Sequence, residues 1–398
     1  MSQLTPKEPR QVAHDLIHHA YAPPAGFDAP QVAVHKASTV IFKDVAALRE
    51  RDWRYKTGYT YGLHGTPTTF TLEERIATLE GARHCLLAPS GLAAVVLVDM
   101  ALLSAGDEVL LPVNVYGPSR EFARNELARW GIGHRLYDPM DAAGLAALIT
   151  PATKLIWLEA PGSITMEFPD LPTLAAVARA HGVTSALDNT WGAGLAFNGF
   201  ELGADVVMQA LTKFPSGGGD VLMGSVCTRD DALHERLKLT HMRSGMGVAA
   251  NDAELVLRSL ASLALRYEAQ DRCARVLAAW LQGRPEVLRV LHPALEGSPG
   301  HRFWGAHCTQ AAGLFSVLMD DRFSAAQVDA FVDALRLFKI GYSWAGPVSL
   351  VVPYDLVQLR PGPRAEDMRG HLVRFSMGLE EPAALQQDLR QALAAAFG

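Results

Sequence analysis

Residues 154–187 contain the stretch that decides the fold. It runs Lys154-Leu-Ile-Trp-Leu-Glu159, then Leu171-Pro-Thr-Leu-Ala-Ala-Val-Ala-Arg-Ala-His181, then Val183-Thr-Ser-Ala-Leu187. Two short apolar runs of strand length flank a segment with the length of a helix. Strand–helix–strand units of this kind are typical of parallel sheets with helices packed on their faces. The stretch therefore predicts an α/β fold with a largely parallel, doubly wound sheet.

The same alternation continues on both sides of this unit. Upstream, the pattern predicts a helix from Thr71 to Gly81, where Thr71–Glu74 fits a capping box, and a helix from Ser90 to about Ser104. The other elements expected in this part are strands at 108–113, 205–211 and 222–228 and a helix at about 118–130. Doubly wound sheets bind ligands at the carboxyl ends of their strands.

Composition and punctuation suggest three regions in the 398 residues. Residues 1–62 are interrupted by prolines and are expected to form an N-terminal arm that contributes to a neighbouring subunit. Residues 63–255 carry the alternating pattern, and residues 256–398 are expected to form a smaller C-terminal α/β domain. The helices expected there are 254–264, 273–281, 325–335 and 382–395, with strands at 313–319 and 372–377.

Charge and composition exclude several classes of protein. The chain is 49% hydrophobic, which argues against disorder, and its 42 acidic residues outnumber its 36 basic residues for a net charge of −6. A nucleic-acid-binding protein usually carries a basic surplus, so no nucleic-acid partner is expected. The four cysteines show no paired spacing, which favours a reducing compartment over a disulfide scaffold.

Two segments bear on location. The N-terminal residues MSQLTPKEPRQVAHDLIHHAY lack the apolar core of a signal peptide. The apolar run Leu86–Ala105 contains Pro89, Ser90, Gly91 and Asp99, which fit a buried helix entered through a turn better than a membrane span. We therefore expect a soluble cytoplasmic protein without a membrane partner.

The most informative segment for chemistry is Leu211-Thr-Lys213-Phe-Pro-Ser-Gly-Gly-Gly219-Asp220. Lys213 ends an apolar strand and enters a glycine run, which is an unusual place for a solvated lysine. Lysines that form Schiff bases need partial desolvation to keep the amine neutral and nucleophilic. An ordinary loop lysine is the alternative that this segment alone leaves open.

Asp188 strengthens the chemical interpretation. It follows the strand Val183–Leu187 directly and precedes Lys213 by 25 residues. An acid at the end of the strand before the lysine matches the partner of the pyridinium nitrogen in pyridoxal phosphate (PLP) enzymes, where it keeps the ring an electron sink. The alternative is a simple turn-forming residue.

Two further features fit a PLP site. Pro89-Ser90-Gly91-Leu92 opens a helix whose first amides could bind a phosphate. Tyr116, just after the strand at 108–113, could stack on a cofactor ring, although a lone aromatic is more often a packing residue.

In this order, the motifs resemble the Cys/Met-metabolism PLP-dependent enzymes, which have the fold-type I architecture of aspartate aminotransferase. The resemblance runs from about residue 30 to residue 390. The motifs that carry it are Tyr61-Gly…Gly65-Thr, Pro-Ser90-Gly91, Tyr116-Gly-Pro-Ser, Glu159-Ala-Pro-Gly-Ser163, Asp188-Asn-Thr-Trp191 and Thr212-Lys213-Phe.

Within that family the chain most resembles the bacterial β-lyases that act on cystathionine. The segments that carry this closer likeness are Pro161–Glu167, Asp188–Trp191, Gln209–Lys213, Leu291–Gly297, Gly313–Ser316 and Tyr342–Gly346. The implied reaction is β-elimination of L-cystathionine to homocysteine, pyruvate and ammonia, a transsulfuration step of methionine biosynthesis. The implied assembly is a homo-oligomer, expected to be a tetramer.

The resemblance also implies roles for individual residues. Lys213 would hold PLP through a Schiff base and move protons, Asp188 would pair with the ring nitrogen, and Tyr116 would stack on the ring. The implied phosphate ligands are the amides of Gly91 and Leu92, the Thr212 hydroxyl, and Tyr61 from a neighbouring subunit.

The substrate would be held by a second set of residues. Arg374 would bind its carboxylate, since an arginine fork pairs with a carboxylate through two hydrogen bonds. The backbone of Ser343 and Trp344 would lie nearby. Apart from these substrate-binding residues, the resemblance implies Lys213, Tyr116 and Tyr61 as the catalytic residues.

Three positions depart from the family pattern. Ala210 replaces a phosphate-binding serine of many members, and Gly218-Gly219 replaces a bulkier pair after the lysine. The phosphate-binding Tyr-x-Arg motif has Leu63 in place of its arginine. We expect His64, Lys56 or Arg54 to supply the missing cation, with His64 favoured by adjacency.

Other functions remain open from sequence alone. A cysteine desulfhydrase, a methionine γ-lyase or a cystathionine γ-lyase would share these motifs, and a weakly catalytic PLP-binding regulatory protein is the contrasting class. His14 and His18 have the i, i+4 spacing of metal ligands, and His301, His307 and Cys308 also cluster in sequence. Neither set has a supporting third ligand, so we assign no metal.

Overall fold

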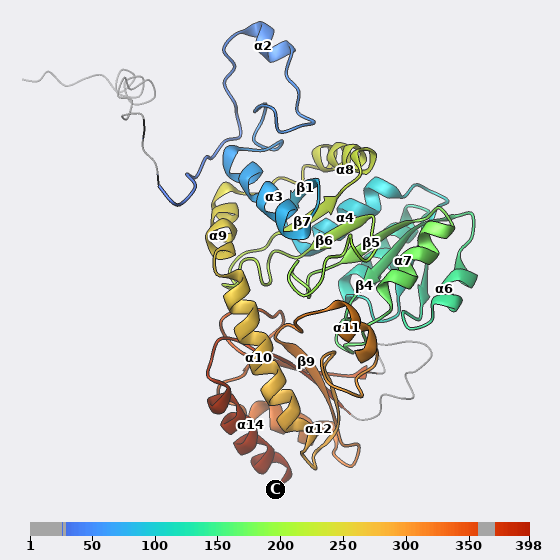
Figure 1. Cartoon of the computed structure of the whole chain (residues 1–398), viewed down its shortest axis with the longest axis vertical. Helices are drawn as coiled ribbons and strands as arrows, with labels where there is room; N and C mark the ends of the chain where they lie inside the picture. Colours follow the sequence, from blue (N-terminus) through green and yellow to red (C-terminus); the bar gives the residue numbers. More distant parts are fainter. Residues whose placement is uncertain (1–25, 27–28, 357–370) are drawn as a thin grey trace, which may run out of the picture. The chain divides into compact units, whose positions relative to one another are not determined.

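The computed structural model describes residues 26, 29–356 and 371–398. Residues Met1–Ala33 and Val34–Gly398 form two separate units, and the description below concerns the second (Figure 1). His14 and His18 lie outside the described residues. The short helix α2 (Val45–Arg49), with no buried residue, lies in the predicted arm.

A seven-stranded sheet forms the larger part of the unit, with strand order β1-β7-β6-β5-β4-β2-β3. Strand β7 runs antiparallel to both neighbours, whereas the other adjacent strands are parallel. The mostly parallel α/β sheet predicted from the sequence is confirmed. Its strands are β1 His84–Ala88, β2 Glu108–Pro112, β3 Gly133–Tyr137, β4 Thr153–Glu159, β5 Thr184–Asp188, β6 Val206–Gln209 and β7 Gly224–Thr228.

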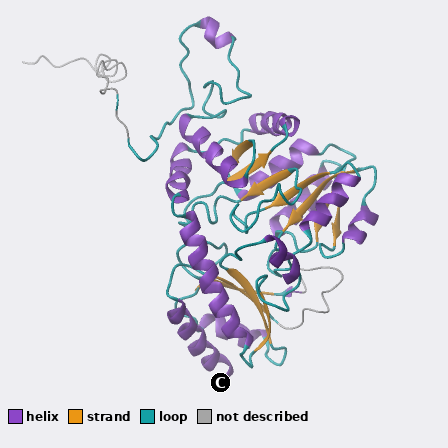
Figure 2. Ribbon diagram, viewed as in Figure 1, coloured by secondary structure: helices purple, strands orange, loops and turns teal. Residues whose placement is uncertain are grey.

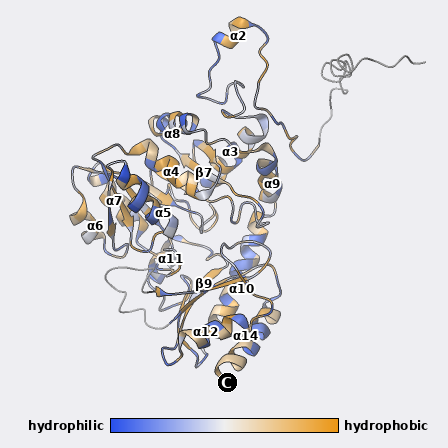
Figure 3. Cartoon of the chain, turned by 180° about the vertical axis from the view of Figure 1, so that it is seen from behind, coloured by the Kyte–Doolittle hydropathy of each residue, from blue (hydrophilic) through white to orange (hydrophobic). Residues whose placement is uncertain are grey.

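Helices cover both faces of this sheet because strand side chains alternate between the faces. In β1, Cys85 and Leu87 join a core that contains residues of α3, α6 and α7. Leu86 and Ala88 join the core beneath α4 and α8, and α4 is hydrophobic along most of its length (Figure 3). The helices are α3 Pro67–Glu80, α4 Gly91–Leu102, α5 Gly117–Phe122 with a π-helical continuation Ala123–Leu127, α6 Ala142–Leu148, α7 Leu171–Ala180 and α8 Asp231–Ser244.

A second sheet of five strands follows, with order β10-β11-β12-β9-β8 (Figure 2). Only the β10–β11 pair is parallel. The strands are β8 Val287–Leu291, β9 Leu314–Met319, β10 Lys339–Ile340, β11 Leu350–Tyr354 and β12 Leu372–Ser376. The helices of this part are α9 Ala250–Leu260, α10 Leu263–Gln282, α11 His301–His307, α12 Ala325–Asp333 and α14 Pro382–Phe397.

Helix α10 belongs to two hydrophobic cores. Its first turns contribute Leu263 and Tyr267 to the core that includes α3 and α7. Its later turns contribute Leu277 and Leu281 to the core under the second sheet. The division expected at residue 255 falls inside α9, and the three-region organisation stays a prediction.

The predicted start of the first helix was wrong. Helix α3 begins at Pro67, because Thr66 caps it in a reciprocal pair with Thr69 and proline suits the first helical position. The Thr71 hydroxyl instead bonds the Pro67 carbonyl inside the helix. The predicted end at Gly81, in the left-handed region, and the Ser90 cap of α4 are both observed.

Candidate active site

Lys213 lies in a tight turn just beyond β6. The amide of Gly217 bonds the Lys213 carbonyl at 2.9 Å, which closes the turn. The Nζ atom donates to Ser343 Oγ at 2.5 Å and lies 5.5 Å from the centre of a Trp344 ring. Burial and the nearby Arg374 lower the pKa of Lys213 to about 8, against the opposing effect of Asp188. About a tenth of this amine is therefore neutral at pH 7, and about half at pH 8.

Asp188 is the last residue of β5. Its Oδ1 accepts hydrogen bonds from the backbone amide and the hydroxyl of Thr190, at 2.9 and 2.5 Å. Burial raises the pKa of Asp188, while the Thr190 bonds and Lys213 lower it. The carboxyl is thus held by Thr190 at the strand end, within electrostatic range of the lysine.

Tyr116 reaches the same edge of the sheet from the loop after β2. Its backbone amide donates to Glu159 Oε2 at 2.8 Å, and Glu159 ends β4 opposite Asp188 in the sheet register. Burial, Asp188 and Glu159 all raise the pKa of the Tyr116 hydroxyl. Tyr116 is 41% exposed, so part of its side chain is accessible to a ligand.

The first turn of α4 completes this edge. Ser90 accepts the amide of Ala93, and the amides of Gly91 and Leu92 have no acceptor within the helix because of their position. A Cβ on Gly91 would lie 2.6 Å from the Cβ of Ala210, so only glycine fits against this strand end. The Thr212 hydroxyl exchanges hydrogen bonds with the Met223 backbone, at 3.1 and 3.0 Å.

Arg374 approaches the lysine from β12 of the second sheet. Its side chain is nearly buried, its Nη2 donates to the Ser343 carbonyl at 3.4 Å, and its guanidinium lies 5.3 Å from the centre of the Tyr354 ring. No carboxylate of the described residues forms an ion pair with it. Since an unpaired buried cation is unfavourable, this arginine fits an anionic ligand.

Ser343 and Ala345 make the turn that joins these groups. Both adopt positive φ angles, 81° and 66°, in a region that non-glycine residues seldom occupy. Ser343 thereby presents its hydroxyl to Lys213 and its carbonyl to Arg374. Trp344 packs edge-on against Phe214, with ring centres 5.5 Å apart.

These groups fit PLP. The partly neutral amine of Lys213 suits the cofactor aldehyde, and the strand-end carboxyl of Asp188 suits the ring nitrogen. The partly exposed side chain of Tyr116 suits the ring face. The free amides of the α4 N-terminus suit its phosphate. The glycine at position 91 keeps that helix end close to the strand end.

The expected substitute for the missing arginine finds little support within one chain. Lys56 pairs with Glu73 and Glu74 at 3.1 and 2.7 Å, and these neighbours raise its pKa despite the effect of burial. A 2.7 Å hydrogen bond joins His64 Nδ1 to the Thr60 hydroxyl. Burial lowers the pKa of His64, so its imidazole is mainly neutral at pH 7.

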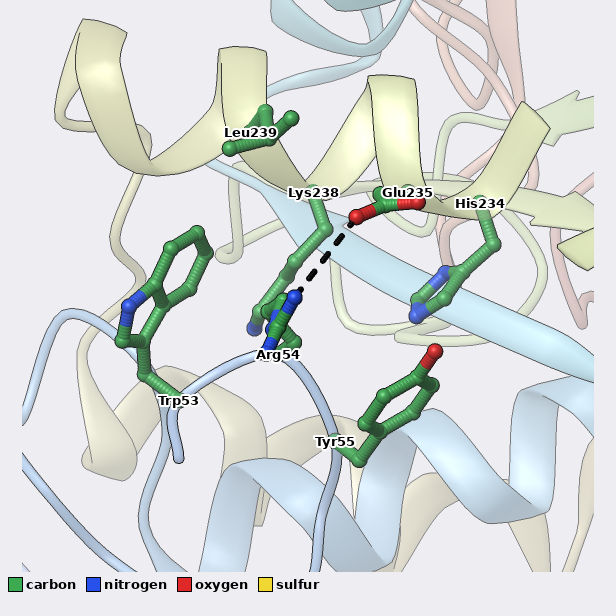
Figure 4. A pocket seen from close by; sticks show the side chains of 7 residues that line it. All are labelled: Trp53, Arg54, Tyr55, His234, Glu235, Lys238 and Leu239. Carbon is green, nitrogen blue, oxygen red and sulfur yellow. Dashed lines mark ion pairs between the residues drawn. The ribbon is translucent and has the colours of Figure 1, made fainter. Parts of the chain in front are cut away.

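Arg54 is the third expected substitute. It pairs with Asp52 at 3.4 Å and Glu235 at 3.9 Å beside a cavity of only 10 Å³ (Figure 4). Such a cavity holds one water at most. Tyr61 is 47% exposed, with its ring 6.0 Å from that of His64. Its role toward a neighbouring subunit stays a prediction.

The family model for Cys/Met metabolism PLP-dependent enzymes matches residues 14–394 of this chain. The chain belongs to this family. Its members depend on PLP, so the expected fold and cofactor are confirmed.

Similar proteins point the same way. The cystathionine β-lyase of Bordetella avium is 40% identical over 388 residues, which cover 95% of this chain and 96% of that protein. The cystathionine β-lyase of Salmonella typhimurium is 35% identical over 89% of this chain and 91% of that protein. The crystal structure of metB from Corynebacterium glutamicum superimposes with a TM-score of 0.85 and 28% identity, covering 96% of this chain and 97% of that one.

Sequence reasoning missed several residues near the site. No role was predicted for Glu159, yet its carboxylate accepts the Tyr116 amide. Glu80, at the end of α3, is fully buried and accepts hydrogen bonds from Asn189 and Gln209. Its position next to the helix-ending Gly81 gives no signal of this contact.

No helix among the described residues is both long and apolar enough to cross a membrane.

Proposed function

We propose that this protein is a carbon–sulfur β-lyase that converts L-cystathionine and water to homocysteine, pyruvate and ammonia. One observation carries the proposal: Lys213 and the nearly buried Arg374 meet at the same residue, Ser343. A proton-transferring amine thus lies beside a site for a carboxylate. The names of similar proteins support this substrate.

The residues divide the work as follows. Arg374 binds the substrate carboxylate and so directs the Cα–H bond toward Lys213. The neutral amine of Lys213 takes the Cα proton and later returns a proton to the departing sulfur. PLP, when bound, supplies the electron sink that makes removal of that proton possible.

The remaining groups orient the cofactor and the lysine. With PLP bound, Asp188 would keep a proton on the ring nitrogen, and Tyr116 would stack on the ring and exclude water. The Ser343 hydroxyl accepts from Lys213 Nζ and its carbonyl accepts from Arg374, so Ser343 would orient the freed amine toward the bound carboxylate.

The decisive experiment is a product assay with L-cystathionine. A β-lyase gives pyruvate, whereas a γ-lyase gives 2-oxobutyrate and cysteine. Parallel assays with L-cysteine and L-methionine separate a desulfhydrase and a methionine γ-lyase. PLP binding without turnover of any of the three would instead support a regulatory protein.

We also propose a homotetramer built from dimers, with Tyr61 completing the site of the neighbouring subunit. Apolar side chains of residues 41–61 support this, since Ile41 is 93% exposed and Val45 and Tyr61 are about half exposed. Mixing Lys213→Ala with Tyr61→Phe protein should restore activity, because each mixed dimer forms one native site. Full activity of a monomer in sedimentation experiments would contradict the shared site.

The cytoplasmic location stays a prediction.

A further inference from the structure

Helix α10 directs three side chains at three different turns of the candidate active site. Arg266 Nη1 donates to the Phe214 carbonyl at 2.8 Å, directly after Lys213. The Tyr267 hydroxyl donates to the Trp191 carbonyl at 3.0 Å, three residues after Asp188.

Gln270 makes the third contact, one helical turn after Arg266. Its Nε2 donates to the Gly346 carbonyl at 3.0 Å, three residues after Ser343. The three turns lie far apart in sequence. One face of one helix therefore bonds the backbone next to the lysine, next to the aspartate and next to the turn that carries the substrate carboxylate site.

Arg266 is built into this position. Its other donors bond Ser262 Oγ at 3.1 Å and the carbonyl and hydroxyl of Ser259 at 3.1 and 2.9 Å. The Ser259 hydroxyl in turn donates to the Ser216 carbonyl at 2.5 Å, inside the lysine turn. No carboxylate of the described residues pairs with Arg266, so its charge is met by backbone and hydroxyl oxygens.

Gly217 shows how closely the guanidinium fits under the lysine turn. This residue has a φ of +64°, and a Cβ there would lie 2.0 Å from Arg266 Nη1. A side chain at position 217 would displace the arginine from the turn. Gly217 and Arg266 thus form one complementary contact.

Tyr267 and Gln270 are equally constrained. Both are buried, and the Tyr267 ring lies 4.5 Å from that of Phe214. A Cβ on Gly313 would lie 2.6 Å from the Cβ of Gln270, so the backbone just before β9 packs directly on this side chain. Neither side chain has room to bind its carbonyl from another position.

We propose that α10 sets the relative positions of the lysine, aspartate and carboxylate-site turns, with Arg266 and Gln270 as positioning residues. That these positions matter for turnover rests on the proposed function, whereas the hydrogen bonds from α10 to the three turns do not. Because the two residues bond different turns, their losses have different consequences. Loss of Arg266 acts on Lys213, and loss of Gln270 acts on the Ser343–Gly346 turn.

The test compares Arg266→Met and Gln270→Leu as holoenzymes, with Arg272→Met and Gln282→Leu on the exposed side or end of α10 as matched controls. Arg266→Met should shift the pH midpoint of the absorbance of bound PLP and raise the Kd for PLP about tenfold, as expected for loss of a charge-assisted hydrogen bond. Gln270→Leu should leave that midpoint unchanged. It should instead raise the Kd for propionate, a carboxylate probe without an amine, several-fold.

Two more variants separate positioning from general stability. Gly217→Ala perturbs the same contact from the other side and should reproduce the spectral shift, and the double variant with Arg266→Met should be non-additive. Arg266→Lys keeps the positive charge, so its midpoint should lie closer to wild type than that of Arg266→Met. If Arg266→Met and Gly217→Ala lower Tm while the pH midpoint and both Kd values match the controls, the proposal is wrong.

These readouts stay informative whatever the reaction is. A wild-type protein that makes no pyruvate from cystathionine would remove the proposed function. The spectral midpoints and the two Kd values would still decide whether α10 positions the site.

Discussion

Glu159 and Asp188 face each other across β4 and β5, each as the last residue of its strand. Burial raises the pKa of both carboxyls, and the charge of Asp188 raises that of Glu159 further. Asp188 also accepts two hydrogen bonds from Thr190 and lies near Lys213, which favour its ionised form. We infer that Glu159 carries the proton of this pair and Asp188 the charge.

Asp188→Asn should therefore be far more damaging than Glu159→Gln. Loss of the charge that holds a proton on the cofactor ring should lower kcat about 100-fold or more, as loss of one electrostatic stabiliser does elsewhere. Glu159→Gln keeps a neutral acceptor for the Tyr116 amide and should cost less than about tenfold. Steady-state pyruvate formation measures both, and equal losses would contradict the assignment.

Lys213 should react as an amine with a pKa of about 8. The neutral form dominates above that pH, so the rate at which apoprotein regains the yellow absorbance of PLP should rise as pH passes through about 8. Lys213→Ala should show neither this absorbance nor β-elimination, and Lys154→Ala, on the exposed side of β4, should behave as wild type. A midpoint near 10.5 would show that the amine is not desolvated in solution.

Arg374 should govern substrate affinity and leave the cofactor in place. Truncation to alanine removes a buried charged partner, which typically costs about 2–5 kcal/mol, so kcat/KM should fall at least about 30-fold with the PLP spectrum intact. Arg322→Ala, at an exposed arginine just after β9 of the second sheet, serves as the control. Loss of bound PLP with unchanged substrate saturation would assign Arg374 to the cofactor instead.

Glu80 should make the stability of the fold depend on pH. Burial raises its pKa from 4.5 to about 7 although Gln209 and Asn189 donate to it, so the folded state binds this proton more tightly than the unfolded chain. Its contribution is full below pH 4.5 and declines by about 3 kcal/mol as pH rises to about 7.

Urea denaturation at several pH values checks this. Glu80→Gln should lose that part of the pH dependence, while Glu126→Gln, at a partly exposed position, should keep it. Asp99, buried with Trp157 as its hydrogen-bond partner, contributes a similar slope in all three proteins and cancels in the comparison. A Glu80→Gln profile that parallels wild type would show that Glu80 does not titrate in this range.

Five of the seven strands of the first sheet were predicted from the sequence, whereas β1 and β3 were missed. Asp188 and Lys213 are recognisable because one ends an apolar strand and the other comes soon after one, and parallel strands bring such ends to one edge. The start of α3 was misjudged, since Thr71 offers a capping pattern as good as that of Thr66.

The other half of the site could not be derived from patterns. Ser343 contacts Lys213 across 130 residues, and neither it nor Arg374 has a local signal that points to the first sheet. Their roles were expected only from the family resemblance. The contacts of Arg266 and Gln270 depend on how α10 packs, which no periodicity reports.

The close fit of Gly91 against Ala210 determines which single substitutions could strengthen cofactor binding in this chain. A Cβ at 91 would lie 2.6 Å from that of Ala210, so the side chain at 210 points directly at the first turn of α4. A serine there would add one oxygen at the helix end without enlarging the backbone spacing. Tighter retention of the cofactor is therefore within one conservative exchange of the present chain, while any exchange at 91 would close that route.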